Sequence, residues 1–283
     1  MTAVYGIMGH PVGHSRSPAM HNRAFAVLGI DAIYVPFSVA PDRLEQAVRG
    51  IHGLDLQGMN VTLPYKSAIM PLLDEVDPDA RSIGAVNTVL RDGSRLRGTN
   101  TDAAGLTRSL EEAGVSLRGT RSVVLGAGGA ARACVIGLAR AGVREIVVAA
   151  RKLDAAEALV QALGQAAHPA QLRVSAWQTD ALGKMFSSAD LVVQATSATL
   201  NGGVAADEFA RTLPLSLLPS QAVVVDIVYH PLETSVLRAA SEQGRRTVDG
   251  LGMLLHQAAL SFELWTGRKA PVAEMRAVLT TAS

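Results

Sequence analysis

The stretch Val123-Val124-Leu125-Gly126-Ala127-Gly128-Gly129-Ala130-Ala131-Arg132-Ala133 decides the fold of this chain. A short run of branched apolar residues breaks into glycines and continues as an alanine-rich segment, which predicts a buried strand, a tight turn and a helix. The small residues have the spacing Gly126-x-Gly128-x-x-Ala131, which is typical of a dinucleotide-binding turn. In such a turn the first glycine allows the bend, and the second lets a pyrophosphate approach the backbone and the helix start. A second apolar run over residues 145–150 completes the predicted unit.

The end of that second strand bears on the choice of cofactor. A site selective for NAD usually has an acidic residue there to bind the ribose 2′-hydroxyl. This chain has Arg151 and Lys152 instead, and two cations can pair with a 2′-phosphate. The residues therefore indicate NADP. The alternative is a solvated pair of charges at a helix start, which Asp154 would partly neutralise.

Composition limits the classes of function that the chain can have. It has 283 residues, of which 48% are hydrophobic and 18% charged, and this suits one large or two ordinary domains. The net charge of +1 and the absence of a basic patch exclude nucleic acid as the expected partner. No apolar run is long enough to span a bilayer, and the first residues do not resemble a signal peptide. With Cys134 as its single cysteine, the chain is expected in the reducing cytoplasm.

The N-terminal part of the chain predicts a separate α/β domain that ends near residue 102. Strands are expected over residues 4–9, 34–39, 58–63 and 84–90, with a hairpin turn over residues 91–94. Helices are expected from about Pro18, over residues 41–50, over a short segment at 77–82 and over 103–113.

Four polar residues of this part lie where ligands are commonly bound. Ser15 and Ser17 stand where helix-start donors collect, which suits a carboxylate, although Ser17 could simply cap the helix. Lys66 follows a strand that ends at Pro64 and is expected to begin a helix, with a solvated surface lysine as the alternative. Asp102 precedes a helix that it could also cap.

The C-terminal part predicts strands that alternate with helices. Apolar runs indicate strands from Val174 onward, over residues 190–197 and over residues 222–229, and helices are expected over 154–163, 252–265 and 271–279. This alternation implies right-handed crossovers and a parallel sheet. His10 and His14 have a spacing that would suit a metal on a helix, but Pro11 and Gly13 predict a loop, so no metal site is expected.

Several fragments together resemble the shikimate dehydrogenase family, and they follow the family's order over nearly the whole chain. They are His14-Ser15-Arg16-Ser17-Pro18, Asn60-Val61-Thr62-Leu63-Pro64-Tyr65-Lys66, Gly84-Ala85-Val86-Asn87-Thr88, Gly98-Thr99-Asn100-Thr101-Asp102, the glycine turn, Ala195-Thr196-Ser197, and Asp249-Gly250-Leu251-Gly252-Met253-Leu254 with Gln257. The resemblance implies NADP-linked interconversion of 3-dehydroshikimate and shikimate in aromatic amino-acid biosynthesis. It also implies a two-domain α/β fold with a cleft between the domains. A substrate-binding domain over residues 1–102 would be joined by the C-terminal helices of residues 250–283, and a Rossmann domain would cover residues 103–249.

The resemblance also assigns roles to individual residues. Lys66 and Asp102 would be the catalytic pair, because reduction of a ketone needs a proton donor near the carbonyl oxygen and a carboxylate can orient it. The substrate would be held by fixed hydrogen bonds from Ser15, Ser17, Thr62, Asn87, Tyr229 and Gln257. The cofactor would be held by Gly126, Ala127, Gly128, Gly129, Ala130, Ala131, Arg151, Lys152, Thr196, Ser197, Ile227, Gly250 and Met253.

Two departures from the family's pattern leave alternatives open. The family usually has Asn-Arg-Thr at the second strand end with another arginine soon after, whereas this chain has Ala150-Arg151-Lys152 and then Ala155. The family's Asn-Ala-Thr-Ser-x-Gly-Met is Gln194-Ala195-Thr196-Ser197-Ala198-Thr199-Leu200 here. A quinate/shikimate paralogue that uses NAD as well as NADP is one alternative, and a non-catalytic NADP-sensing protein is another. The chain is expected to be a monomer or a homodimer.

Overall fold

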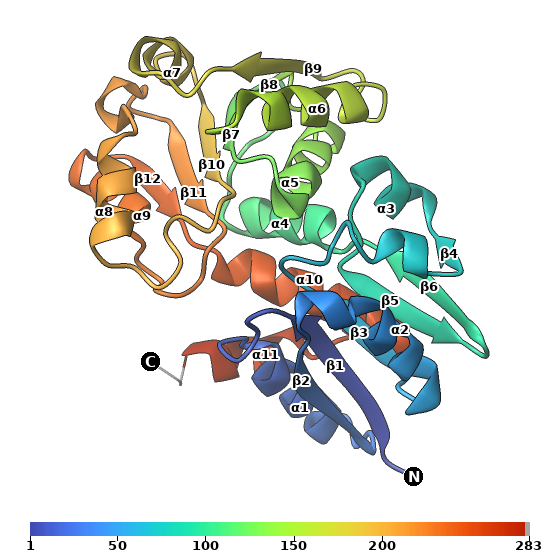
Figure 1. Cartoon of the computed structure of the whole chain (residues 1–283). Coiled ribbons are helices and arrows are strands. Elements are labelled where there is room, and N and C mark those ends of the chain that lie inside the picture. Colours follow the sequence, from blue (N-terminus) through green and yellow to red (C-terminus); the bar gives the residue numbers. More distant parts are fainter. Residues whose placement is uncertain (281–283) are drawn as a thin grey trace. The chain divides into compact units, whose positions relative to one another are not determined.

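The computed structural model describes residues 1–280 and contains two compact α/β units (Figure 1). The first unit comprises Met1–Gly105 together with the chain from Leu254 onward, and the second comprises Leu106–Met253. The sequence placed these divisions near residues 102 and 250. Helices α4 and α10 each begin in one unit and continue into the other, so the exact division falls inside helices that no composition change marks.

The first unit is built on a mixed sheet with the strand order β2-β1-β3-β5-β6-β4. Its strands are β1 (Ala3–Gly9), β2 (Ala32–Ser38), β3 (Gly58–Val61), β4 (Glu75–Val76), β5 (Thr88–Asp92) and β6 (Arg95–Thr99). Strand β1 pairs in parallel with β2 and β3, whereas β5 is antiparallel to both β3 and β6. The predicted strand over residues 84–90 begins only at Thr88, because Gly84, with φ +71°, ends the preceding helix in the left-handed conformation.

The helices of the first unit cover this sheet and enclose an apolar core. They are α1 (Ser17–Val27), α2 (Leu44–Gly53), α3 (Pro78–Ile83), the start of α4 (Asp102–Glu112), most of α10 (Leu251–Thr266) and α11 (Val272–Thr280), with short 3-10 turns at Pro41–Arg43 and Met70–Leu72. The predicted helix over residues 41–50 is therefore a 3-10 turn followed by α2. Lys66 does not begin a helix as predicted: it lies in a series of turns that leads to the 3-10 turn Met70–Leu72.

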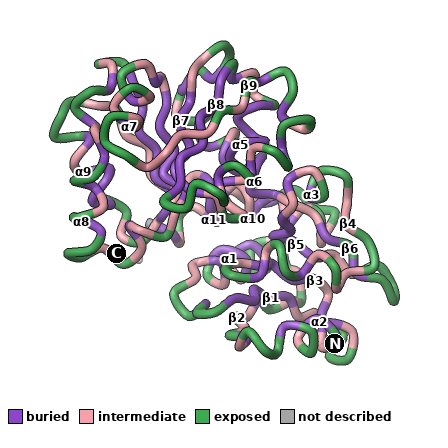
Figure 2. The backbone as a smooth tube through the Cα atoms, turned by 45° about the horizontal axis from the view of Figure 1, so that its top comes forward, coloured by how far each residue is buried: buried purple, intermediate pink, exposed green. Residues whose placement is uncertain are grey.

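The second unit has an all-parallel sheet in the order β9-β8-β7-β10-β11-β12, which is that of a doubly wound dinucleotide-binding fold. Its strands are β7 (Arg121–Leu125), β8 (Glu145–Ala149), β9 (Gln171–Ser175), β10 (Leu191–Gln194), β11 (Val223–Asp226) and β12 (Arg246–Val248). The backbone is buried along β7 and β8 and exposed at the surface turns (Figure 2). The predicted parallel sheet is confirmed here.

The crossovers of this sheet include helices that the sequence did not predict. The predicted ones are α5 (Gly129–Arg140) and α6 (Leu153–Leu163), and the others are α7 (Thr179–Phe186), α8 (Val204–Arg211) and α9 (Ser235–Glu242), with a 3-10 turn at Leu215–Leu217. The strands predicted over 190–197 and 222–229 end earlier, at Gln194 and Asp226. The residues after each strand end belong to loops at the carboxyl edge of the sheet, where ligands bind in this class of fold.

His21, in helix α1, is buried in an aromatic cluster of the first unit. Its ring stacks on Tyr34 with centroids 4.4 Å apart and an interplanar angle of 10°, and Phe25, Phe262 and Trp265 lie around it. Among the described residues neither ring nitrogen has a hydrogen-bond partner. Burial lowers the pKa of His21 from 6.5 to about 3, so the folded protein holds this imidazole neutral.

Because His21 is buried in its neutral form, the first unit should become less stable at acidic pH. Between pH 6.5 and about 3 the unfolded chain binds a proton at His21 and the folded chain does not, so stability falls as the pH falls. The loss is about 1.4 kcal/mol for each pH unit within this window. His21→Phe should make the free energy of unfolding, measured with urea at pH 7.5 and pH 5, less dependent on pH.

The matched control is Phe25→Leu in the same aromatic cluster, which changes the packing around His21 but removes no titratable group. It should keep the pH dependence of the unsubstituted protein. An unchanged dependence in His21→Phe would show that His21 does not remain neutral in the folded state.

Candidate active site

Lys66 and Asp102 form an ion pair in the first unit. The Lys66 ammonium Nζ lies 2.6 Å from Asp102 Oδ2, and the two side chains are 14% and 6% exposed. Lys66 is positioned by the turns after β3, where its carbonyl accepts a hydrogen bond from the backbone N–H of Val86 at 2.7 Å. Asp102 is the first residue of α4, where the positive end of the helix favours a carboxylate. The pairing places a proton-bearing group next to a fixed negative charge.

The other carboxylate oxygen of Asp102 is held by Asn87. The Asn87 side-chain Nδ2 donates to Asp102 Oδ1 at 2.8 Å and to Thr101 Oγ1 at 2.9 Å, and Asn87 Oδ1 accepts from the Thr101 backbone N–H at 2.8 Å. At the start of α4, Asn100 Oδ1 accepts from the backbone N–H groups of Asp102 and Ala103 at 3.0 and 3.4 Å. With Asn87 on one carboxylate oxygen, Asp102 bonds the Lys66 ammonium through the other.

A buried polar network lies behind this pair, and the sequence had assigned it no role. Ser261 Oγ of α10 lies within hydrogen-bond distance of Asn60 Nδ2, Thr88 Oγ1 and Thr101 Oγ1, at 3.1, 2.8 and 3.2 Å. Asn60 Oδ1 accepts from the Tyr34 hydroxyl at 2.7 Å. Buried polar groups that are all satisfied make a rigid arrangement, so this network fixes the positions of Asn87 and Asp102.

Of the four remaining predicted substrate residues of the first unit, three lie at element ends and Gln257 lies within α10. Ser17 is the first residue of α1 and Arg16 is its cap residue, so the interpretation of Ser17 as the N-cap is wrong. Ser15 Oγ accepts from the Ser17 backbone N–H at 3.2 Å. Thr62 follows β3 and is half-buried, and Gln257 in α10 donates to the Leu254 carbonyl at 2.8 Å. These groups are neutral hydrogen-bonding side chains of the kind that bind hydroxyl and carboxylate oxygens.

The glycine turn of the second unit has the backbone that the sequence predicted. Gly126, with φ +120°, stands in a conformation that L side chains rarely adopt, and a Cβ there would lie 3.0 Å from the Ala195 carbonyl oxygen. Gly128 precedes α5, and a Cβ there would meet nothing within 4 Å. The helix start is thus open to a phosphate, as a dinucleotide site requires.

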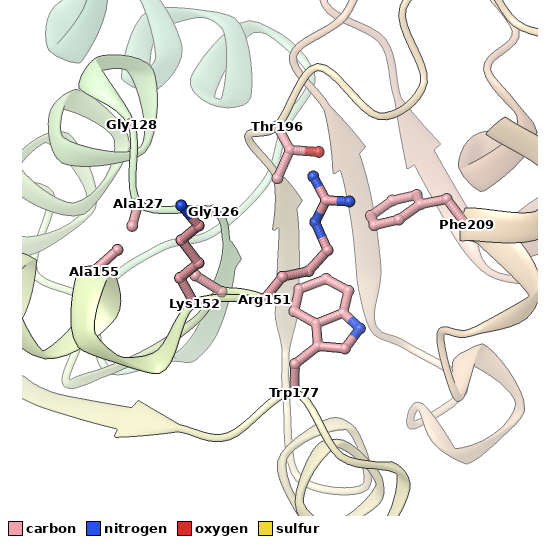
Figure 3. A pocket seen from close by; sticks show the side chains of 10 residues that line it. Gly126, Ala127, Gly128, Arg151, Lys152, Ala155, Trp177, Thr196 and Phe209 are labelled. Carbon is pink, nitrogen blue, oxygen red and sulfur yellow. The ribbon is translucent and has the colours of Figure 1, made fainter. Parts of the chain in front are cut away.

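A cavity of ≈ 680 Å³ lies beside this turn, within the size range of ligand sites. Its lining residues are Gly126, Ala127, Gly128, Ala150, Arg151, Lys152, Ala155, Trp177, Thr196 and Phe209. In Figure 3 the Arg151 side chain extends past the indole of Trp177 toward Phe209 and Thr196, while Lys152 lies beside Gly126. Backbone donors, two cations and an apolar wall fit a phosphorylated dinucleotide. Trp177 and Phe209 were not predicted, because they come from segments without a motif.

A buried carboxylate holds the loop that carries Thr196 and Ser197. Asp226 Oδ2 accepts from Thr199 Oγ1 at 2.8 Å and from Thr234 Oγ1 at 2.7 Å. Gln194 Nε2 donates to Thr199 Oγ1 at 3.0 Å, and Gln194 Oε1 accepts from the Thr196 backbone N–H at 2.6 Å. Burial raises the pKa of Asp226, and the hydrogen bonds that it accepts oppose this shift. Gln194 and Thr199, two of the departures from the family's pattern, thus have a structural role in this loop.

The other predicted residues of the second unit lie in three places. Gly129, Ala130 and Ala131 form the first turn of α5. Ile227 and Tyr229 follow β11, while Gly250 and Met253 lie at the start of α10. A Cβ at Gly250 would lie 2.4 Å from the Ile227 carbonyl oxygen, so this glycine is required for the close approach of two backbones.

Neither a metal-binding cluster nor a membrane-spanning helix is found among the described residues. No group of three or more His, Cys, Asp and Glu side chains that could hold a metal ion occurs in this part of the chain. None of the helices over residues 1–280 has both the length and the apolar character that crossing a membrane requires.

Comparison with known proteins identifies the family. A model of the shikimate dehydrogenase substrate-binding domain matches residues 7–89, one of shikimate/quinate 5-dehydrogenase matches residues 108–239, and one of the shikimate 5′-dehydrogenase C-terminal domain matches residues 250–280. The NADP⁺ shikimate dehydrogenase of Symbiobacterium thermophilum is 46% identical over 280 residues, covering 99% of this chain and 94% of that protein. This chain belongs to the shikimate dehydrogenase family.

Solved structures of the same family have the same fold. Shikimate 5-dehydrogenase from Thermus thermophilus, in complex with NADP(H) and shikimate, is 37% identical with a TM-score of 0.86, and the match covers 99% of this chain and 100% of that one. Quinate dehydrogenase from Corynebacterium glutamicum, in complex with NAD, is 32% identical with a TM-score of 0.88 over 99% of both chains. The family therefore includes proteins named for two related substrates and two cofactors.

The two glycines of the turn give a prediction that separates folding from binding. Gly126→Ala should lower the free energy of unfolding by about 1–3 kcal/mol, because alanine is strained at φ +120° and the carbonyl of Ala195 blocks its methyl group. Gly128→Ala is the matched control for stability, since its surroundings are open. It should unfold like the unsubstituted protein in a thermal melt but bind a nicotinamide dinucleotide more weakly in calorimetry. Equal stability of both variants would contradict this account of the turn.

Proposed function

We propose that this chain catalyses the NADP-linked, reversible reduction of 3-dehydroshikimate to shikimate, a step of aromatic amino-acid biosynthesis. The observation that carries the proposal is the 2.6 Å pair of Lys66 and Asp102 within a polar site, in a member of the shikimate dehydrogenase family. Relatives about 45% identical over nearly the whole chain are named NADP⁺ shikimate dehydrogenases. The chain is an oxidoreductase that acts on a CH–OH group.

The proposed chemistry divides between cofactor and protein. Bound NADPH supplies the hydride that the carbonyl carbon accepts. Lys66 Nζ donates a proton to the carbonyl oxygen, which becomes the hydroxyl of shikimate. Asp102 orients the Lys66 ammonium and balances its charge, and Asn87 keeps the carboxylate in place. In the reverse direction Lys66 would accept the proton of the substrate hydroxyl.

The other proposed substrate contacts suit a small carboxylate with several hydroxyls. Ser15 and Ser17 lie at the start of α1, where N–H groups and hydroxyls together can bind the carboxylate. Thr62 and Gln257 would bond ring hydroxyls, and Tyr229 is the contact that we propose from the second unit. Neutral hydrogen-bonding groups that match each oxygen discriminate strongly against analogues without that oxygen.

The proposed cofactor site is the cavity beside the glycine turn. The open backbone at Gly128 and the first N–H groups of α5 would hold the pyrophosphate. Arg151 and Lys152 at the end of β8 would bind the 2′-phosphate of NADP. Thr196, Ser197, Ile227, Gly250 and Met253 would line the path of the nicotinamide half.

A quinate/shikimate dehydrogenase that also uses NAD is the second candidate. The similarity to the quinate dehydrogenase of Corynebacterium glutamicum in complex with NAD favours it. A spectrophotometric assay that combines shikimate and quinate with NADP⁺ and NAD⁺ decides between the two. We expect the fastest reduction with shikimate and NADP⁺. Turnover of quinate with NAD⁺ at a comparable rate supports the second candidate, and no turnover in any combination contradicts both.

Lys66 and Asp102 should act as a unit in this assay. Lys66→Ala removes the proton donor and should reduce kcat about 10²–10⁴-fold while NADPH binding, measured by calorimetry, stays nearly the same. Asp102→Asn should also reduce kcat, because an amide cannot balance the ammonium charge. The double variant should be little worse than the worse single one, since groups that act together are not additive.

Two outcomes would contradict this mechanism. Losses that multiply in the double variant would show that the residues act independently. A near-normal kcat for Lys66→Ala would show that the proton comes from another group.

Arg151 should contribute to the preference for NADP. Arg151→Ala removes a charge-assisted contact with the 2′-phosphate, and the Kd for NADP⁺ should rise roughly ten- to hundredfold while that for NAD⁺ changes little. Arg211→Ala, an exposed arginine of α8 outside the cavity lining, is the control and should leave both constants unchanged. Equal weakening of both cofactors would show that Arg151 does not contact the 2′-phosphate.

A further inference from the structure

We infer that Trp177 and Phe209 form an aromatic wall on which the adenine ring of the cofactor stacks. The inference rests on the proposed function, and it adds two residues that neither the glycine turn nor the family motifs point to. Both side chains line the same cavity as Gly128 and Arg151. Their rings lie 5.8 Å apart between centroids with an interplanar angle of 30°, so they make one continuous apolar surface (Figure 3).

The strand order puts this wall where a base has to lie. In a sheet with this order the pyrophosphate binds at the turn after β7, and the ribose binds at the end of β8. Trp177 follows β9, which is the neighbour of β8, and Phe209 comes from α8, in the crossover after β10. The carboxyl ends of these parallel strands share one edge, so the two rings stand beside the position of the ribose.

The wall is formed before a ligand binds. Trp177 and Phe209 are both partly buried and pack against the apolar core of the second unit, which restricts their rotamers. Rigid aromatic surfaces bind a flat ring without a large loss of side-chain entropy. On the opposite side of the cavity, the small side chain of Ala155 leaves room for a purine.

The aromatic part of the cavity suits a base, and the part that contains the cations suits a phosphate. Arg151 extends past Trp177 with its guanidinium group at the edge of the aromatic wall (Figure 3). An adenine on the wall would thus hold its 2′-phosphorylated ribose close to that cation. The chemistry identifies the ligand of this part of the cavity as an adenosine 2′-phosphate group, with stacking for the base and charge for the phosphate.

Binding of 2′,5′-ADP and 5′-AMP to the full-length protein tests the inference without catalysis. Trp177→Ala and Phe209→Ala should each raise the Kd for both ligands by the same factor, roughly five- to hundredfold, because both ligands contain adenine. Arg151→Ala should weaken only 2′,5′-ADP. Trp177→Phe should retain most of the affinity, and Leu217→Ala, exposed and outside the cavity lining, should retain all of it.

A fluorescence signal gives a second readout that a purely structural role would not produce. The chain has two tryptophans, so in Trp265→Phe the emission comes from Trp177 alone. Saturable quenching by 2′,5′-ADP is expected in that variant. Far-UV circular dichroism and thermal melts verify that each variant is folded, and Phe209→Leu replaces Phe209→Ala if the latter unfolds.

Unchanged Kd values in folded Trp177 and Phe209 variants overturn the inference, as does 2′,5′-ADP binding that leaves Trp177 emission unaltered. In that case reduction of NADP⁺ by the unsubstituted enzyme with shikimate would leave the proposed function intact. If the unsubstituted protein binds neither 2′,5′-ADP nor NADP⁺, both the inference and the proposed function are wrong.

Discussion

The site depends on the carboxylate of Asp102 being held from two sides. Lys66 bonds one oxygen at 2.6 Å and Asn87 bonds the other at 2.8 Å, while the side chain is almost fully buried. Removal of charged groups from water is costly, and the loss of one partner of a buried pair commonly costs about 3–5 kcal/mol. The polar network of Ser261, Asn60 and Thr88 offsets this cost by giving each neighbouring group a partner. Segments far apart in the sequence are therefore fixed around one charge pair.

A backbone constraint has the same importance in the second unit. Gly126 brings the chain within contact distance of Ala195 and Thr196, which join the turn after β7 to the loop after β10. That loop is in turn fixed by the buried carboxylate of Asp226. The phosphate-binding turn and the neighbouring loop thus depend on each other, and a dinucleotide would meet a surface that is already formed.

The sequence predicted those features that depend on local pattern. Gly126-x-Gly128-x-x-Ala131 after an apolar run predicted the strand, turn and helix. The pairing of Lys66 with Asp102, 36 positions apart, was implied only by the resemblance to the shikimate dehydrogenase family. The sequence did not reveal features that arise from tertiary contact. Helices α7 and α8 have no side-chain cap, and α9 is short although Thr234 caps it. Ser261 lies in a helix with no motif of its own, and His21 resembles an ordinary helix residue in the sequence, although aromatic rings surround it in the fold. A charged residue at the end of an apolar strand, as at Asp226, was the one signal that could have indicated the buried loop anchor.

Chemical rescue tests the central claim, that the Lys66 amine carries the proton to the substrate oxygen, most directly. In Lys66→Ala, the rate of NADPH oxidation by 3-dehydroshikimate would be measured as methylammonium is added at constant pH and ionic strength. We expect a slow reaction that accelerates in proportion to the amine concentration, whereas the unsubstituted enzyme and Asp102→Asn show no such increase. A full rate in Lys66→Ala before any amine is added, or an equal acceleration of all three proteins, would show that the Lys66 amine does not carry the proton.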